Sequence, residues 1–124
     1  EGQEIFYARS AVVIHAAAFG LQPIDTLVTD FGDEARLIED CKFGAQLGFV
    51  GKLAIHPKQV DIIQAAFTPS NEEIARAQKL LKAHDEHQAS GSGAFAIDGQ
   101  MIDRPIIRAA EQVLAKARAA GKIS

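Results

Sequence analysis

The stretch GKLAIHP at residues 51–57 decides the fold class. Residues 51–55 are predicted to form a short strand. His56 closes this strand, because the residue before a proline is pushed out of the α region. A short helix is predicted to follow over 58–66. The stretch is therefore read as one strand followed directly by one helix.

A second unit of the same kind precedes this stretch. β-Branched residues predict a strand over 24–29, and apolar residues at helical spacing predict a helix over 34–47. Another helix is predicted over 4–19, with Gly20 as its stop and a buried stripe of Ile5, Ala8, Val12, Ala16 and Phe19. Strands that alternate with helices indicate a parallel sheet of the α/β class. Parallel sheets are covered on both faces, so two or three strands are expected to be a slice of a larger fold, with apolar faces that lack partners.

The rest of the chain is predicted to be helical, with one break. Residues 70–73 form an S-x-x-E capping box that opens a helix from 71 to about 87. The stretch 89–93, rich in serine and glycine, is linker-like. Asp103 is predicted to cap a last helix that ends at Gly121.

The composition is that of an ordinary globular domain, with 48% hydrophobic and 23% charged residues in 124, which excludes disordered and fibrous classes. Lysines and arginines are scattered and the net charge is -3, so no nucleic-acid partner is expected. No apolar run approaches a membrane span of about 20 residues. The single cysteine, Cys41, is expected to face the core, and without a signal peptide a reducing cytoplasm is predicted.

Several positions could carry chemistry, and each has a structural alternative. Reacting groups of α/β folds lie at the carboxyl ends of strands, where Asp30, Asp33 and His56 are placed. The two carboxylates could hold a metal, act as a base or cap a helix, and the histidine could be an acid, a base or a turn residue. Asp103 could be an N-cap, or could act in catalysis if its segment reaches an active site. The HDEH motif at 84–87 could chelate a metal or merely favour a helix C-terminus.

The sequence around the opening stretch resembles a known family. LGFVGKLAIHPKQV at 47–60, followed by FTPS at 67–70, is similar to the signature of citrate lyase beta subunit-like proteins of the HpcH/HpaI aldolase family. Three other stretches agree in order, at 7–10, 24–33 and 93–103. The resemblance implies the C-terminal portion of a TIM (β/α)₈ barrel plus a C-terminal helical extension. Residues 1–88 would belong to the barrel domain, and 89–124 would form an extension that serves as a lid or contacts other subunits.

The resemblance implies a Mg²⁺-dependent lyase that cleaves or forms a C–C bond in a CoA thioester. The substrate would be of the citryl-CoA, malyl-CoA or citramalyl-CoA type, and the reaction would pass through an enolate. A cytoplasmic homo-oligomer, a trimer or a multiple of it, is expected. The family's metal ligands and its catalytic arginine precede the segment that matches Glu1, so no metal ligand is expected in this chain.

One catalytic residue of the family falls inside the match. It is the aspartate of the G-x-M-I-D motif, here Asp103, which would act as acid or base in the active site of a neighbouring subunit. Ile55, His56 and Pro57 would line the pocket for CoA and substrate at the barrel mouth. The alternative is a non-catalytic α/β fragment or association module without the metal site. In support of a fragment, the 124 residues lack an initiator methionine and amount to half of the roughly 250 residues of a barrel.

Overall fold

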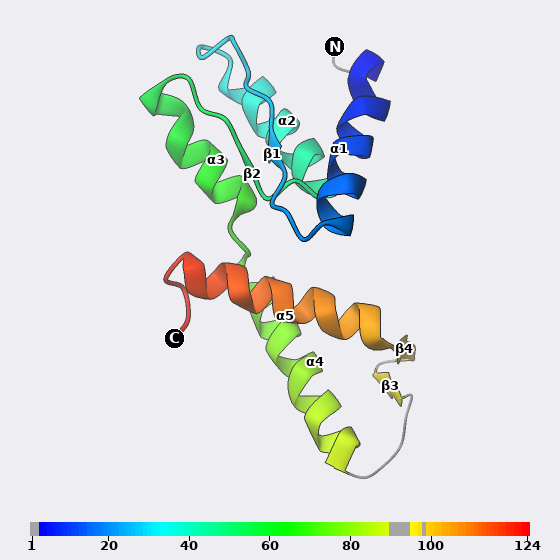
Figure 1. The fold of residues 1–124 in the computed structure, drawn as a ribbon. Helices are drawn as coiled ribbons and strands as arrows, with labels where there is room; N and C mark the ends of the chain where they lie inside the picture. Colours follow the sequence, from blue (N-terminus) through cyan, green and yellow to red (C-terminus); the bar gives the residue numbers. More distant parts are fainter. Residues whose placement is uncertain (1–2, 90–94, 98) are drawn as a thin grey trace. The chain divides into compact units, whose positions relative to one another are not determined.

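Helices alternate with short strands in the N-terminal half of the computed structural model, which describes residues 3–89, 95–97 and 99–124 (Figure 1). The chain divides into two units, Glu1–Phe67 and Thr68–Ser124. Of the predicted linker 89–93, Ala89 ends a helix and the rest lies outside the described residues. In chain order the elements are η1 (Gln3–Ile5), α1 (Phe6–Ala18), β1 (Ile24–Asp25), α2 (Glu34–Leu47), β2 (Gly51–Lys52), η2 (Pro57–Gln59), α3 (Val60–Phe67), α4 (Asn71–Ala89), β3 (Phe95–Ile97), β4 (Gln100–Ile102) and α5 (Arg104–Ala119).

The sheet of the first unit consists of β1 and β2, which pair in parallel. This pairing confirms the predicted α/β class. The ladder is short, and the N–H of Leu53 still donates to the carbonyl oxygen of Asp25 at 3.1 Å. Beyond that bond the side chain of Gln59 bridges the backbones of Val28 and Ile55. The predicted strands 24–29 and 51–55 are therefore too long.

Helix α2 has the predicted bounds, because its two ends carry strong local signals. Asp33 caps it by accepting a hydrogen bond from the N–H of Arg36 at 2.9 Å. Gly48 ends it with φ at 105°, a left-handed conformation that favours glycine. Glycine is also favoured by space, because a Cβ there would lie 2.9 Å from the side chain of Val13. Cys41 faces the core as predicted, and burial raises the pKa of its thiol. The buried cluster of this unit comprises Val28, Leu37, Cys41 and Ile63.

Large apolar side chains remain exposed on β1, directly after β2 and on α1. Ile24 and Leu53 are 50% and 53% exposed. Of the stripe predicted for the first helix, Ala16 is buried but Val12 and Phe19 are exposed. Among the described residues, the expectation that apolar faces would stay uncovered is therefore confirmed, as suits a segment of a barrel whose strands are covered on both sides.

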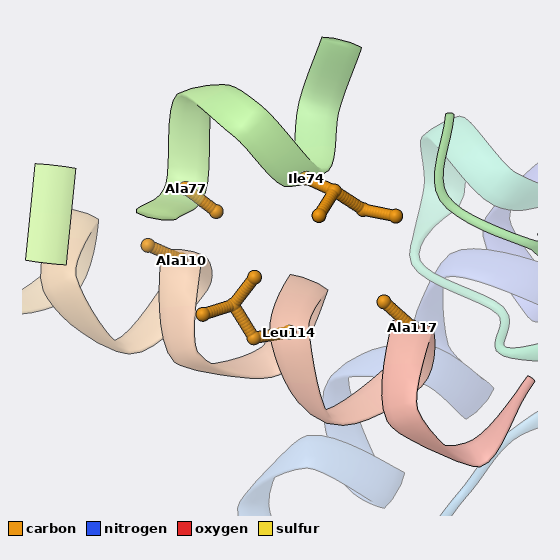
Figure 2. Close-up of a cluster of buried hydrophobic side chains, with 5 residues drawn as sticks. All are labelled: Ile74, Ala77, Ala110, Leu114 and Ala117. Carbon is orange, nitrogen blue, oxygen red and sulfur yellow. The ribbon is translucent and has the colours of Figure 1, made fainter. Parts of the chain in front are cut away.

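The second unit is built on α4 and α5, which pack against each other along apolar stripes. The hairpin of β3 and β4, which was not predicted, pairs antiparallel and leads into α5. Among the residues that the structure describes, no helix combines the length and apolar character needed to span a bilayer. Figure 2 shows the buried contact between the helices, formed by Ile74, Ala77, Ala110, Leu114 and Ala117.

The predicted capping box forms at the start of α4. The N–H of Glu73 donates to Ser70 Oγ at 3.1 Å, and the N–H of Ser70 donates to Glu73 Oε2 at 2.7 Å. The hydrogen bond from the Ser70 backbone holds the pKa of Glu73 below its ordinary value of 4.5. The charged form of Glu73 therefore stabilises the folded state.

We expect Glu73→Gln to destabilise the protein at neutral pH and to matter less in acid. A carboxyl whose pKa is lowered by folding stabilises the folded state above its unfolded pKa, and this contribution is lost as the pH falls through the folded pKa. The difference in unfolding free energy between wild type and variant should shrink as the pH falls below 4.5. Urea unfolding over a pH series measures this difference. Ser70→Ala should cost about 0.5–2 kcal/mol at neutral pH, and a Glu73→Gln difference that stays constant with pH would contradict the assignment.

Candidate active site

The turns that follow the two strands lie side by side. The ring of Phe31, after β1, stacks on the ring of His56, after β2, with the ring centroids 4.7 Å apart and the planes 10° from parallel. Parallel strands present their carboxyl ends at one edge of the sheet, where α/β enzymes place their reacting groups. The structure therefore brings Phe31 and His56 together, one from each of the predicted positions 30–33 and 55–57.

The polar groups of these turns are engaged in local structure. His56 Nδ1 accepts a hydrogen bond from the N–H of Lys58 at 3.2 Å, which confirms the turn interpretation. Asp30 Oδ1 accepts from the N–H of Gly32 at 2.9 Å, and Asp33 is the cap of α2. Around them, Ile55 and Pro57 are exposed, so the edge offers apolar surface next to a half-buried imidazole.

Gln59 joins the two turns, and it was not predicted from the sequence. Its Oε1 accepts from the N–H of Ile55 at 2.9 Å, and its Nε2 donates to the carbonyl oxygen of Val28 at 3.0 Å. The residue is 1% exposed. The sequence signals only that an amide side chain closely follows the His56–Pro57 turn. It does not show that this amide bonds Val28, because Val28 is 31 residues away along the chain.

A buried ionic cluster joins four elements of the first unit, and it too was not predicted. Asp25 Oδ2 of β1 lies 2.6 Å from Nη2 of Arg9 on α1 and 3.0 Å from Nζ of Lys52 on β2. Asp40 of α2 contacts both cations as well. The side chains of Arg9, Asp25 and Lys52 are 7%, 1% and 0% exposed. The four charges cancel, which makes this degree of burial tolerable.

The cluster is tightly enclosed. The guanidinium of Arg9 lies over the rings of Phe43 and Phe49, 5.0 Å and 5.9 Å from their centroids. Gly44 of α2 faces the carboxylate, and a Cβ there would lie 2.6 Å from Oδ2 of Asp25. Glycine at this position therefore allows α2 to approach the ion pair of Asp25 and Arg9.

The carboxylates brought together in the first unit are already paired with cations. Among the described residues, no group of three or more His, Cys, Asp or Glu side chains is arranged to hold a metal ion. Asp25 and Asp40 are the one pair of carboxylates brought together by the ionic cluster, and both are already neutralised by Arg9 and Lys52. A divalent cation would have to displace these buried partners.

Asp103 lies in the second unit, at the start of α5. Its Oδ1 accepts a hydrogen bond from the N–H of Ile106 at 3.2 Å, which confirms the N-cap interpretation. The residue is exposed and lines a cleft of about 480 Å³, together with His84, Arg104 and Arg108. Capping uses one hydrogen bond of the carboxylate, so the cleft position leaves it accessible from solvent.

Comparison with known proteins identifies the family. Residues 6–122 match the model of the C-C_Bond_Lyase family of the TIM-barrel fold. The mitochondrial citramalyl-CoA lyase of Rattus norvegicus is 45% identical over 112 residues, which are 90% of this chain and 33% of that protein. The citrate lyase subunit beta of Leuconostoc mesenteroides subsp. cremoris is 36% identical over 119 residues, 96% of this chain and 39% of that protein.

A solved structure agrees with this match. Protein CitE from Mycobacterium tuberculosis, in complex with magnesium, acetoacetate and coenzyme A, aligns with a TM-score of 0.75 and 36% sequence identity. The alignment covers 90% of this chain and 40% of that chain, and the chain spans about a third of the length of its citramalyl-CoA lyase relative. The strand–helix pairs β1–α2 and β2–α3 thus belong to a TIM barrel, and the chain belongs to the C–C bond lyase family of that fold.

Proposed function

We propose that the full-length protein is a lyase that cleaves or forms a C–C bond in a CoA thioester through an enolate. The observation that carries this proposal is the family match over residues 6–122. Relatives named citramalyl-CoA lyase and citrate lyase subunit beta support a substrate of the citramalyl-CoA, citryl-CoA or malyl-CoA class. The magnesium and coenzyme A in the CitE structure support Mg²⁺ as the cofactor, with ligands outside these 124 residues.

Asp103 is the proposed acid or base. In the cleavage direction the substrate hydroxyl loses its proton, the C–C bond breaks, and the enolate carbon of the departing acyl-CoA gains a proton. A carboxylate at the reacting centre can accept the first proton or deliver the second. The exposure of Asp103 in a polar cleft supports this role. We further propose that the extension 89–124 delivers Asp103 to the active site of a neighbouring subunit.

The strand-exit turns are the proposed pocket lining. Ile55, His56 and Pro57 stand at the edge where TIM barrels bind their substrates, within the proposed barrel domain of residues 1–88. The exposed apolar surface of Ile55, 49% exposed, supports contact with the apolar arm of a CoA ester.

The proposed assembly is a homo-oligomer, a trimer or a multiple of it. The proposed delivery of Asp103 to a neighbouring active site requires such an assembly. We place it in the cytoplasm, where a reduced cysteine such as Cys41 is normal. The rat relative is described as mitochondrial, so fractionation of the source cells is the test of location.

The activity is tested with the full-length protein, Mg²⁺ and each of citramalyl-CoA, malyl-CoA and citryl-CoA, with acetyl-CoA release followed by chromatography. Release from at least one ester, abolished by a chelator, is expected. No release from any of them would contradict the proposal. The 124-residue chain alone should be inactive in this assay, and robust turnover by it would show that the metal site had been wrongly placed outside it.

A further inference from the structure

The amide of Gln59 takes the place of a peptide group between the segments that follow β1 and β2. The backbone ladder ends with the bond from Leu53 N–H to the Asp25 carbonyl oxygen. Further along, Gln59 accepts a hydrogen bond from Ile55 on one side and donates one to Val28 on the other. A carboxamide offers both a donor and an acceptor, so it can satisfy one backbone group on each segment.

Burial makes this bridge hard to replace. Gln59 is 1% exposed and its hydrogen bond to the carbonyl oxygen of Val28 is buried, so loss of the amide would leave that oxygen without water to substitute for it. The main-chain N–H of Gln59 also donates to the carbonyl oxygen of His56 at 3.0 Å. The residue therefore holds the histidine turn through both its backbone and its side chain.

The segments that Gln59 joins are those that carry the stacked rings. His56 directly follows Ile55, and Phe31 lies in the turn that begins just after Val28. Gln59 therefore links the two segments that lead into these turns. Phe31 is 53% exposed, so the stacked pair presents aromatic surface at the edge of the sheet.

We propose that Gln59 is a positioning residue for the substrate site, holding Ile55 and the Phe31–His56 pair in the arrangement that receives the substrate. The proposal rests on the proposed function, which places the pocket at these turns. Gln59 touches no substrate, because it is covered by the segments it joins. Its effect is exerted through the turns.

The test uses variants of the full-length protein. Gln59→Leu keeps the approximate size and removes both hydrogen-bonding groups, and Gln59→Asn keeps the amide on a shorter side chain. Gln64→Leu, on the exposed side of α3, is the matched control. NMR of the His56 ring protons reports stacking on Phe31, with Phe31→Leu as the unstacked reference. Steady-state kinetics with the CoA ester that the wild type cleaves gives KM and kcat separately.

In folded Gln59→Leu we expect the His56 resonances to move toward those of Phe31→Leu, and KM to rise on the order of tenfold with a smaller change in kcat. Gln64→Leu should alter neither. If Gln59→Leu does not fold, Gln59→Asn is expected to change the same quantities in the same direction.

An unchanged KM in the folded variants would overturn the proposal, whether or not the His56 resonances move, since Gln59 would then be structural only. Inactivity of the wild type with every CoA ester would instead refute the proposed function. In that case the resonances alone decide whether Gln59 holds the aromatic pair: movement supports the positioning, and its absence overturns it.

Discussion

Asp103→Asn is expected to lower kcat of the full-length lyase by about 10²–10⁴-fold, the usual contribution of a general acid or base, with little loss of stability. Asparagine caps helices about as well as aspartate. The amide oxygen can accept the same hydrogen bond from Ile106 N–H. One substitution therefore separates the two roles, because the cap survives while the proton-carrying carboxylate is lost.

The measurement pairs kcat with thermal unfolding and with the oligomeric state from light scattering. Asp103→Ala should show the same loss of kcat and, in addition, destabilisation of about 0.5–2 kcal/mol from the missing cap. Asp61→Asn, an exposed carboxylate in the first turn of α3, is the control and should leave kcat unchanged. Normal turnover by Asp103→Asn would reduce Asp103 to a cap.

Local features of the fold could be predicted from sequence because their partners are close along the chain. The caps at Asp33 and Asp103 and the box at 70–73 each involve residues within one helical turn. Gly48 ends α2 for an equally local reason, since only glycine readily adopts the left-handed conformation. Such signals place helix ends well, whatever the surrounding fold.

The features that hold the first unit together were not predictable in this way. The partners of Asp25 are 16 and 27 residues away, and apolar periodicity assumes that charged side chains point outward. On α1 this assumption placed Val12 inside, whereas Arg9 is buried together with Ala16. The strand lengths were overestimated for a related reason, because nothing in the sequence shows that Gln59 replaces the ladder.

Asp25→Ala is expected to destabilise the protein by about 3–5 kcal/mol, the usual cost of removing one partner from a buried ion pair. The carboxylate is bonded by both Arg9 and Lys52. Without it, two buried cations would share Asp40, which is 28% exposed and is less able to neutralise them. Urea unfolding measures the loss, and a cost below about 1 kcal/mol, as for an exposed pair, would contradict the burial of this cluster.

Gly44 offers an independent check of the same geometry. Gly44→Ala alone should cost about 1–3 kcal/mol as overpacking, because its Cβ would lie 2.6 Å from Oδ2 of Asp25. In the Asp25→Ala background that oxygen is absent, so the combined cost should be smaller than the sum of the two single costs. Gly44→Ala combined with Asp61→Ala should be additive, because the exposed Asp61 is not among the groups that a Cβ at Gly44 would meet. Additivity in the Asp25 pair as well would mean that the carboxylate does not face α2, and the cluster would have to be held by Asp40 instead.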